Sequence, residues 1–225
     1  MTVESRPLVI FGASNIVSDL FDCALANRLL PTKVVLHLPE DQDERSIPLA
    51  QRVAALAPLC PPPAIEQLAD FHPQAGECYL LGPTTPTREV LATELAQRWS
   101  LRFHTLVHPT AYVSPLATLG EGVFVGANSV IAPGARLADH VFVNRGVTIG
   151  HDTHIDAFSR VQPGSNVGGL SRIGRGVTIG IGATLIERLR IGEGAYIGAG
   201  AVVLEDVATH SLVVGIPAKF KKPMN

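Results

Sequence analysis

The sequence has no excess of charge of either sign. Its 18 basic and 20 acidic side chains leave a formal charge of -2, so the charge balance does not indicate a nucleic-acid or anionic-membrane partner. It has no apolar run near the roughly 20 residues that a membrane-spanning helix needs. The first residues enter a strand-like run directly and lack the layout of a signal peptide. We therefore expect no nucleic-acid partner and no membrane association.

Cysteine is also scarce, with only Cys23, Cys60 and Cys78 in the chain. An odd number without metal-like spacing favours neither a disulfide framework nor a zinc site. Cysteine is often buried, and reduced thiols are typical of the cytoplasm. We expect core thiols, a cytoplasmic location and no metal.

What the sequence does have is a repeat of six residues that fills its second half. From Val107 onward the chain divides into seventeen hexads without an insertion, each led by Val, Ile or Leu. The fifth position of each hexad is nearly always small or β-branched, with Leu189 the bulky exception, and Gly is frequent at the second and fourth. This period fits short strands joined by tight turns, with the lead residues inside. The leads are Val107, Val113, Leu119, Val125, Ile131, Leu137, Val143, Ile149, Ile155, Val161, Val167, Ile173, Ile179, Leu185, Ile191, Ile197 and Val203.

Residues 7–104 follow another pattern, in which strand-like and helix-like stretches alternate. Such alternation predicts a small parallel sheet of the Rossmann type. The Pro-rich and charged segment 39–63 is expected to be a loop. The expected strands are 7–11, 33–38 and 78–81, and the expected helices are about 15–30 and 87–99.

Two turns of this first region are candidates for binding a substrate. Gly12, Ala13 and Ser14 follow the first strand, and Gly82 follows the third. Ligands of such sheets bind beyond the carboxyl ends of the strands, often at a helix N-terminus. The first turn is not a complete dinucleotide fingerprint, and a tight turn alone would also need its Gly. Arg88 either meets a phosphate or is a solvated helix arginine.

The hexad pattern resembles the hexapeptide-repeat transferases. That resemblance implies a left-handed parallel β-helix in which three hexads close one coil of 18 residues, an exception to the usual right-handed crossover. We expect a Rossmann-like acceptor-binding domain at 1–104, an acyltransferase β-helix at 105–209 and a C-terminal capping segment at 210–225. The fold class is thus an α/β domain followed by an all-β left-handed parallel β-helix.

The whole chain resembles a narrower group, the sialic-acid O-acetyltransferases and the N-acetyltransferases of nucleotide-linked 4-amino-sugars. The stretches that carry this resemblance are LVIFGAS, LLGPTTPTRE, TLVHPTAYVSPLATLGEG, VNRGVTIGHD and the ending AYIGAGAVVLEDV with VVGIPAK. It implies direct acetyl transfer from acetyl-CoA to the amino group of a nucleotide-linked amino-sugar. It also implies a catalytic set of Asn144, His151 as general base and Asp152 as its orienting partner.

The residues around His151 favour the same chemistry. Histidine can take a proton from an attacking group at neutral pH. One coil after His151 comes Gly169, whose lack of a side chain leaves room for a substrate and whose N–H can stabilise an oxyanion, worth roughly 3 kcal/mol. Spacing alone also allows a solvated His151 and an Asp152 that serves only its turn.

Coenzyme A is expected to run along the later coils toward the C-terminal segment. The candidate cofactor-binding residues are Arg160, Gly169, Ile181, Ala199 and Lys219. Lys219, Lys221 and Lys222 either hold its phosphates or form a solvated basic tail. Because a corner histidine needs a second wall to close its site, we expect a homotrimer with three sites between subunits.

Three departures from the family pattern concern the ligands. Arg160 stands where the family usually has a His, and Ser14-Asn15 stands where it has Gly-His. His37 and Leu38 end the second strand where relatives have acidic residues that hold the nucleotide. The acceptor therefore stays open: an O- or N-acyltransferase of a non-nucleotide small acceptor, or a non-catalytic structural trimer, are the alternatives. A carbonic anhydrase-like metal site is not favoured, because His140, His151 and His154 lack its spacing.

Overall fold

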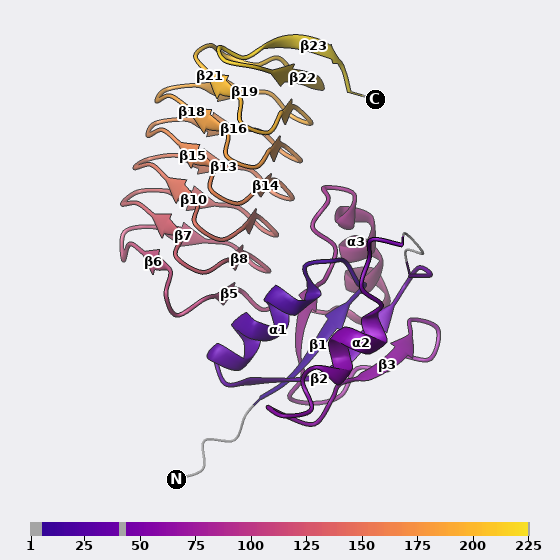
Figure 1. Cartoon of the computed structure of the whole chain (residues 1–225). Helices are drawn as coiled ribbons and strands as arrows, with labels where there is room; N and C mark the ends of the chain where they lie inside the picture. The colour runs from indigo at the N-terminus through magenta and orange to yellow at the C-terminus, as the bar shows by residue number, and fades with distance from the viewer. Residues whose placement is uncertain (1–5, 41–43, 225) are drawn as a thin grey trace. The chain divides into compact units, whose positions relative to one another are not determined.

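The computed structural model describes residues 6–40 and 44–224. The chain divides into two compact units, the first formed by residues up to Thr84 with Val90–His104 and the second by Thr85–Glu89 with everything from Thr105 onward (Figure 1). The short segment 85–89, which we expected to lie wholly within the first domain, is thus counted with the second unit.

The first unit is built on sheet A, which has four parallel strands in the order β3-β2-β1-β4. Its central strand contributes Leu8, Val9, Ile10 and Phe11, all fully buried, as expected for a parallel strand covered on both faces. The N-terminal parallel α/β sheet predicted from the sequence is confirmed. Its elements are β1 (Arg6–Phe11), α1 (Val17–Ala26), β2 (Leu29–Leu36), α2 (Leu49–Ala54), β3 (Ala64–Gln67), β4 (Cys78–Leu81) and α3 (Arg88–Trp99).

Some elements of this unit differ from the expectation. Helix α1 ends at Ala26 because Arg28 takes a φ of 59°, and β2 begins at Leu29 rather than near 33. Pro31 is tolerated inside β2 because the pairing with β1 shifts register between Leu8 and Val9. The segment 39–63 contains helix α2, and β3 was not predicted at all. Its three cysteines are free, and burial raises the pKa of Cys23 to about 12.

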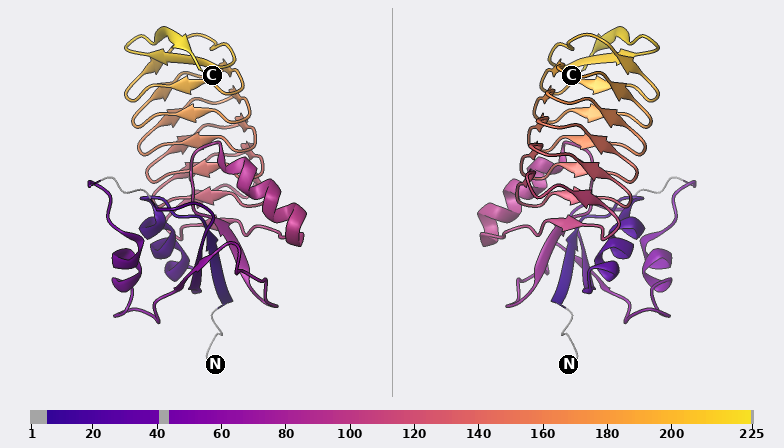
Figure 2. Two further views of the ribbon diagram at one scale, coloured as in Figure 1. Left: turned by 90° about the vertical axis from the view of Figure 1, so that its right-hand side faces the viewer. Right: turned by 90° about the vertical axis from the view of Figure 1, so that its left-hand side faces the viewer.

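The second unit is a stack of triangular coils whose three sides form three sheets (Figures 1 and 2). Neighbouring strands within each sheet are parallel and lie 18 residues apart, so Leu137 pairs with Ile155 and Ile155 with Ile173. This is the arrangement of the left-handed parallel β-helix predicted from the hexads. Sheet B contains β5 (Leu106–Val107), β8 (Phe124–Val125), β11 (Phe142–Val143), β14 (Arg160–Val161), β17 (Thr178–Ile179), β20 (Tyr196–Ile197), β22 (Ser211–Val214) and β23 (Lys219–Pro223).

The other two sides complete each coil in the chain order B, C, D. We call the turns between them the BC, CD and DB corners. Sheet C contains β6 (Tyr112–Val113), β9 (Val130–Ile131), β12 (Thr148–Ile149), β15 (Asn166–Val167), β18 (Thr184–Leu185) and β21 (Val202–Val203). Sheet D contains β7 (Thr118–Leu119), β10 (Arg136–Leu137), β13 (His154–Ile155), β16 (Arg172–Ile173) and β19 (Arg190–Ile191).

The interior of the β-helix is filled by the residues that lead the hexads. The leads from Val125 to Val203 are buried, whereas the first three are only partly so. Hydroxyls at the fifth position are buried beside them and bonded to carbonyls of the next coil, as Ser129 Oγ is to the Asn144 oxygen at 2.7 Å and Ser165 Oγ to the Gly180 oxygen at 2.7 Å. These buried hydroxyls are thus paired, as a stable core requires.

The last coil is closed by a hairpin that leaves the hexad register. Strand β22 continues sheet B, and β23 returns antiparallel to it. The Ala218 N–H donates to the Val202 oxygen at 2.7 Å, so this segment covers the end of sheet C. Within the described ranges, none of the helices is long and apolar enough to cross a bilayer.

Candidate active site

A histidine and an aspartate form a dyad at the CD corner that follows β12. The Asp152 Oδ2 lies 2.9 Å from the His151 Nδ1, and the two side chains are 61% and 58% exposed. Asp152 takes a φ of 55°, a conformation that Asp tolerates better than most residues. One coil earlier in the chain, a side chain at Gly134 would collide with the Asp152 carboxylate. The carboxylate is therefore placed to hold the imidazole with Nδ1 protonated, which leaves Nε2 free to accept a proton.

Gly169 lies one coil after this dyad along the chain, and its lack of a side chain leaves space for the His151 ring. A Cβ at Gly169 would come within 2.8 Å of the His151 Nε2 and 2.9 Å of its Cδ2. A side chain is excluded at the neighbouring Gly150 and Gly168 for a different reason, because a Cβ at either would meet the backbone of the next coil. Gly169 thus keeps the reactive nitrogen uncovered.

The main chain at Gly169 offers a donor beside that nitrogen. Gly168 donates its N–H to the Leu185 oxygen, and Leu170 donates to the His151 oxygen, both within 2.9 Å. The Gly169 N–H has no main-chain partner among the residues that the structure describes. A main-chain N–H without such a partner can stabilise a developing oxyanion.

Asn144 lies at the BC corner, at the other end of strand β12 from His151. Its Oδ1 accepts the Arg145 N–H at 2.8 Å and its Nδ2 donates to the Gln162 Oε1 at 3.3 Å. The amide is buried and braces this corner. One chain therefore brings His151, Asp152 and Gly169 together and leaves Asn144 at a separate corner.

The candidate cofactor residues divide between the same two corners. Ile181 and Ala199 are exposed and lie one coil apart at the BC corner. Lys219 pairs with Val214 at the end of sheet B, and its ammonium lies 3.8 Å from Glu205, which follows sheet C. Gly169 and Ile181 therefore lie at two different corners of one chain.

Arg160 projects from β14 on sheet B and is half-buried. Its Nε donates to the Thr178 Oγ1 at 3.0 Å, and burial lowers its pKa. It lies close enough to Arg88 for its charge to lower the pKa of the Arg88 guanidinium, after the larger effect of burial. Arg160 is thus a cation held on the side of the prism that leads into the BC corner.

Arg88 has a role that neither sequence interpretation described. It is only 4% exposed and donates to the carbonyl oxygens of His140, Ser159 and Thr85. Its guanidinium also lies 5.8 Å from the centre of the Phe158 ring. Instead of meeting solvent, it fastens the segment 85–89 to the DB corner, and the adjacent Glu89 forms an ion pair with Arg175.

In the first unit, the two predicted turns meet. The Ser14 Oγ donates to the Gly82 oxygen at 2.8 Å, and a Cβ at Gly82 would clash with the Gly12 carbonyl. Gly12 has a φ of 77°, and a Cβ there would lie 2.9 Å from the His37 Cε1. The two turns thus pack closely against each other at the carboxyl ends of β1 and β4, through Gly12, Ser14 and Gly82. Ala13, in the first turn, is half-buried.

Two side chains that sequence reasoning did not assign lie beside these turns. The His37 Nδ1 is buried and has no hydrogen-bond partner among the described residues, and burial lowers the pKa of this imidazole. Arg52 of α2 donates to the Asn15 Oδ1 at 3.1 Å and to the Ser18 Oγ at 3.0 Å, in the first turn region of α1. The sequence does not indicate Arg52, because the segment 39–63 is rich in Pro and charge and predicts a loop. Arg52 lies in helix α2 of this segment.

These features define a left-handed β-helix with a histidine–carboxylate dyad at its corner, a form found among acyl-transferring enzymes. The model for bacterial transferase hexapeptide (six repeats) matches residues 116–151 and 170–205. Among curated protein sequences, none matches the chain. Residues 116–151 and 170–205 thus carry hexapeptide repeats of the bacterial transferase type, and the chain is similar over nearly its full length to a solved acetyltransferase domain.

The acetyltransferase domain of PglB from Neisseria gonorrhoeae is similar over 96% of this chain and 100% of that one, at 29% identity and a TM-score of 0.80. The same domain was also solved with acetyl coenzyme A, with a TM-score of 0.79. PerB from Caulobacter crescentus, solved with CoA and GDP-perosamine, shares the fold over 98% of this chain and 99% of that one, at 23% identity and a TM-score of 0.76.

Proposed function

We propose that the protein transfers an acetyl group from acetyl-CoA directly to the amino group of a nucleotide-linked amino-sugar, with His151 as general base. The observation that carries this proposal is the dyad itself: an imidazole held by Asp152, with its second nitrogen uncovered by Gly169. The similarity to the PglB domain, which was solved with acetyl coenzyme A, supports the choice of donor.

In this mechanism His151 Nε2 accepts a proton from the amine as its nitrogen attacks the thioester carbonyl carbon. The Gly169 N–H donates to the carbonyl oxygen as negative charge develops there. When the carbon–sulfur bond breaks, His151 returns the proton to the leaving sulfur. Asp152 stays ionised throughout and stabilises the imidazolium that forms between these steps.

A second copy of the chain completes the site in this proposal. The outer side chains of sheet C include the 57% exposed Tyr112 and the 40% exposed Val130, and none of its six outer residues is charged. An uncharged face with exposed Tyr112 and Val130 is suited to contact with another protein surface. Packing sheet C against other copies in a closed trimer would face the BC corner of one copy toward the CD corner of the next. Asn144, Arg160, Ile181 and Ala199 would then meet His151 and Gly169 of a neighbour.

The acceptor's nucleotide is assigned to the first unit, at the turns that contain Gly12, Ala13, Ser14 and Gly82. The N-terminus of α1 offers the positive end of its helix dipole to a diphosphate. Arg52, which is held at this helix end, adds a cation. A small acceptor without a nucleotide would leave these features without a function.

The test is a thiol-release assay with acetyl-CoA and UDP-, GDP-, dTDP- and CMP-linked amino-sugars, with the products identified by mass spectrometry. We expect N-acetylation of one of them and binding of that nucleotide sugar by calorimetry. Turnover of simple amines or alcohols alone would overturn the nucleotide-sugar assignment and leave the acyltransferase. Absence of turnover with every acceptor, together with a trimeric state, would support a structural role instead.

A further inference from the structure

The outer face of sheet D carries a column of basic side chains that the dyad does not use. Arg136, His154, Arg172 and Arg190 occupy equivalent positions on β10, β13, β16 and β19, each paired in register with the next. Neighbouring strands of a sheet are roughly 4.8 Å apart. Cations stacked at that distance repel one another and destabilise the sheet unless an anion lies between them.

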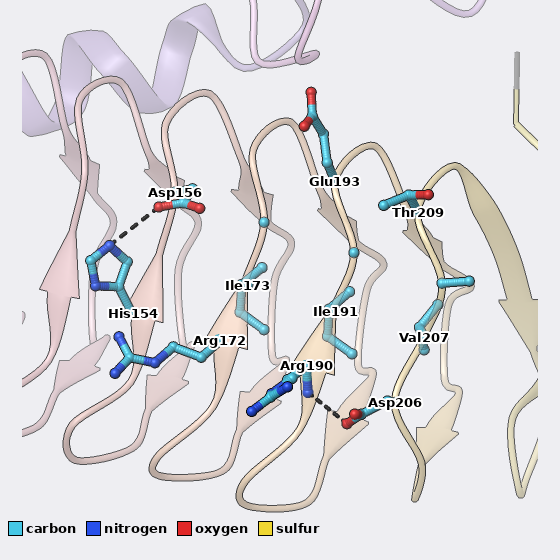
Figure 3. Close-up of a pocket in the computed structure, with 13 residues that line it drawn as sticks. His154, Asp156, Arg172, Ile173, Arg190, Ile191, Glu193, Asp206, Val207 and Thr209 are labelled. Carbon is cyan, nitrogen blue, oxygen red and sulfur yellow. Dashed lines mark hydrogen bonds and ion pairs between the residues drawn. The ribbon is translucent and has the colours of Figure 1, made fainter.

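Neither Arg172 nor Arg190 has such an anion in the chain itself. Among the described residues, their guanidinium groups make no ion pair and no hydrogen bond. Of the three carboxylates that line the groove beside them, Asp156 lies 3.2 Å from the His154 Nε2, Asp206 accepts the main-chain N–H of Arg190 at 2.8 Å, and Glu193 stands on the opposite side (Figure 3). Two adjacent arginines therefore present all their side-chain donors to the outside.

These arginines border a groove of about 740 Å³ that crosses the later coils of sheet D. Figure 3 shows Arg172 and Arg190 on one side of the groove, and Glu193 and Thr209 on the other. Its floor is flat because Gly174 and Gly192 carry no side chains. A groove of this volume is in the range of sites for nucleotide-sized ligands.

The groove begins beside the corner that carries the dyad. Arg172 follows Gly169 by three residues in the same coil, and Arg190 lies one coil further from His151. An extended ligand with its reacting end at His151 can therefore reach both arginines with its far end by running along the CD corner.

We propose that Arg172 and Arg190 bind the phosphates of coenzyme A, with its nucleotide end in the groove on sheet D. This inference rests on the proposed function, because it takes the acetyl donor to react at His151. The planar guanidinium fork matches phosphate oxygens better than an ammonium does. Lys219, the candidate from the sequence, is a weaker choice because Glu205 already lies 3.8 Å from its ammonium.

The test is calorimetric binding of CoA, dephospho-CoA and pantetheine to the full-length wild-type protein and to the double variant Arg172→Gln/Arg190→Gln. We expect the double variant to bind CoA at least about tenfold more weakly, because each charge-assisted bond to phosphate is lost, and to bind pantetheine as the wild type does. Arg172→Lys/Arg190→Lys should recover part of the affinity. Arg136→Gln, on the other side of His154 in the same column, is the matched control and should leave CoA binding unchanged.

Three results would overturn the proposal. The first is wild-type affinity for CoA in the glutamine double variant, and the second is an equal loss for CoA and pantetheine. The third is a loss of affinity for nucleotide sugar instead of CoA, which would assign the groove to the acceptor's diphosphate. If wild-type protein bound no CoA at all, the proposed function itself would fail, so the two failures are distinguishable.

Discussion

At the scale of single residues, the chemistry depends on what surrounds one imidazole. His151 is exposed, and the groups that the structure places next to it are a carboxylate at 2.9 Å and a residue without a side chain. The carboxylate sets the tautomer, and the glycine leaves Nε2 accessible. These two neighbours turn a surface histidine into a candidate base, and they can be tested separately.

Replacing His151 with Ala should lower kcat by about 10² or more, because the proton of the attacking amine then has no acceptor in place. The KM for acetyl-CoA should change little, since the imidazole acts in the reaction and not in donor binding. Asp152→Asn should cost less, as it mainly disturbs the tautomer. Steady-state kinetics with the true acceptor check this, and wild-type turnover in His151→Ala would show that another group is the base.

Gly169→Ala tests the space below the imidazole. The new methyl group would come within 2.8 Å of the His151 Nε2, so the ring must move or lose access to substrate. We expect kcat to fall by about tenfold or more, because a misplacement near 1 Å is enough for such losses. The melting temperature should change little, since the closest contacts fall on an exposed side chain and the nearest main-chain atom, the His151 oxygen, lies at 3.0 Å. Glu187→Ala, at the equivalent position one coil after Gly169, is the control and should keep full activity.

At the scale of elements, the periodic part of the molecule could be predicted and the aperiodic part could not. The hexads specify their own coils, because each lead residue repeats the same inward position, and all leads from Val125 to Val203 are buried. In the first unit, β4 was predicted at its observed bounds, but β2, β3 and α2 were misplaced or missed. The six residues of α2 are too few to show a helical period, and Pro31 concealed the start of β2.

The candidate site shows the same division between local and distant information. His151 and Asp152 could be predicted from a sequence motif. Gly169 could be predicted because it comes one coil of 18 residues after His151. Arg88 does not, because its carbonyl partners at His140 and Ser159 lie more than fifty residues away in sequence. No short-range sequence pattern indicates that contact. From the sequence alone, a buried helix arginine such as Arg88 cannot be distinguished from a solvated one.

Arg88→Met should destabilise the second unit by about 2–4 kcal/mol. The substitution keeps much of the apolar stem, but it leaves the carbonyls of His140, Ser159 and Thr85 without this donor in a buried place. Denaturant unfolding monitored by circular dichroism measures the effect. Arg98→Met, in the exposed last turn of the same helix, should change the unfolding free energy by less than about 0.5 kcal/mol. Equal effects of the two variants would remove the fastening role of Arg88.

At the scale of the whole molecule, the candidate site residues of one chain divide between two corners of the prism. Asn144, Ile181 and Ala199 lie at the BC corner, while His151 and Gly169 lie at the CD corner. Sheet C spans the distance between these corners, and its outer face is uncharged, in contrast to the arginines of sheet D. The two faces of the same prism are therefore suited to different surroundings, sheet C to protein and sheet D to water and anions.

This contrast predicts a trimer that depends on sheet C. Tyr112→Glu together with Val130→Glu should bury two carboxylates in the subunit contact, which is costly enough to dissociate it. Because the proposed site combines residues of two copies, activity should disappear together with the trimer, while circular dichroism stays that of a folded β-helix. Thr118→Glu with Arg136→Glu, at the equivalent positions of sheet D, is the matched control and should leave both mass and turnover unchanged. Light scattering coupled to size exclusion gives the mass of each variant. A wild-type monomer with full turnover, or an active monomeric Tyr112→Glu/Val130→Glu variant, would mean that one chain completes the site alone and that the interface assignment is wrong.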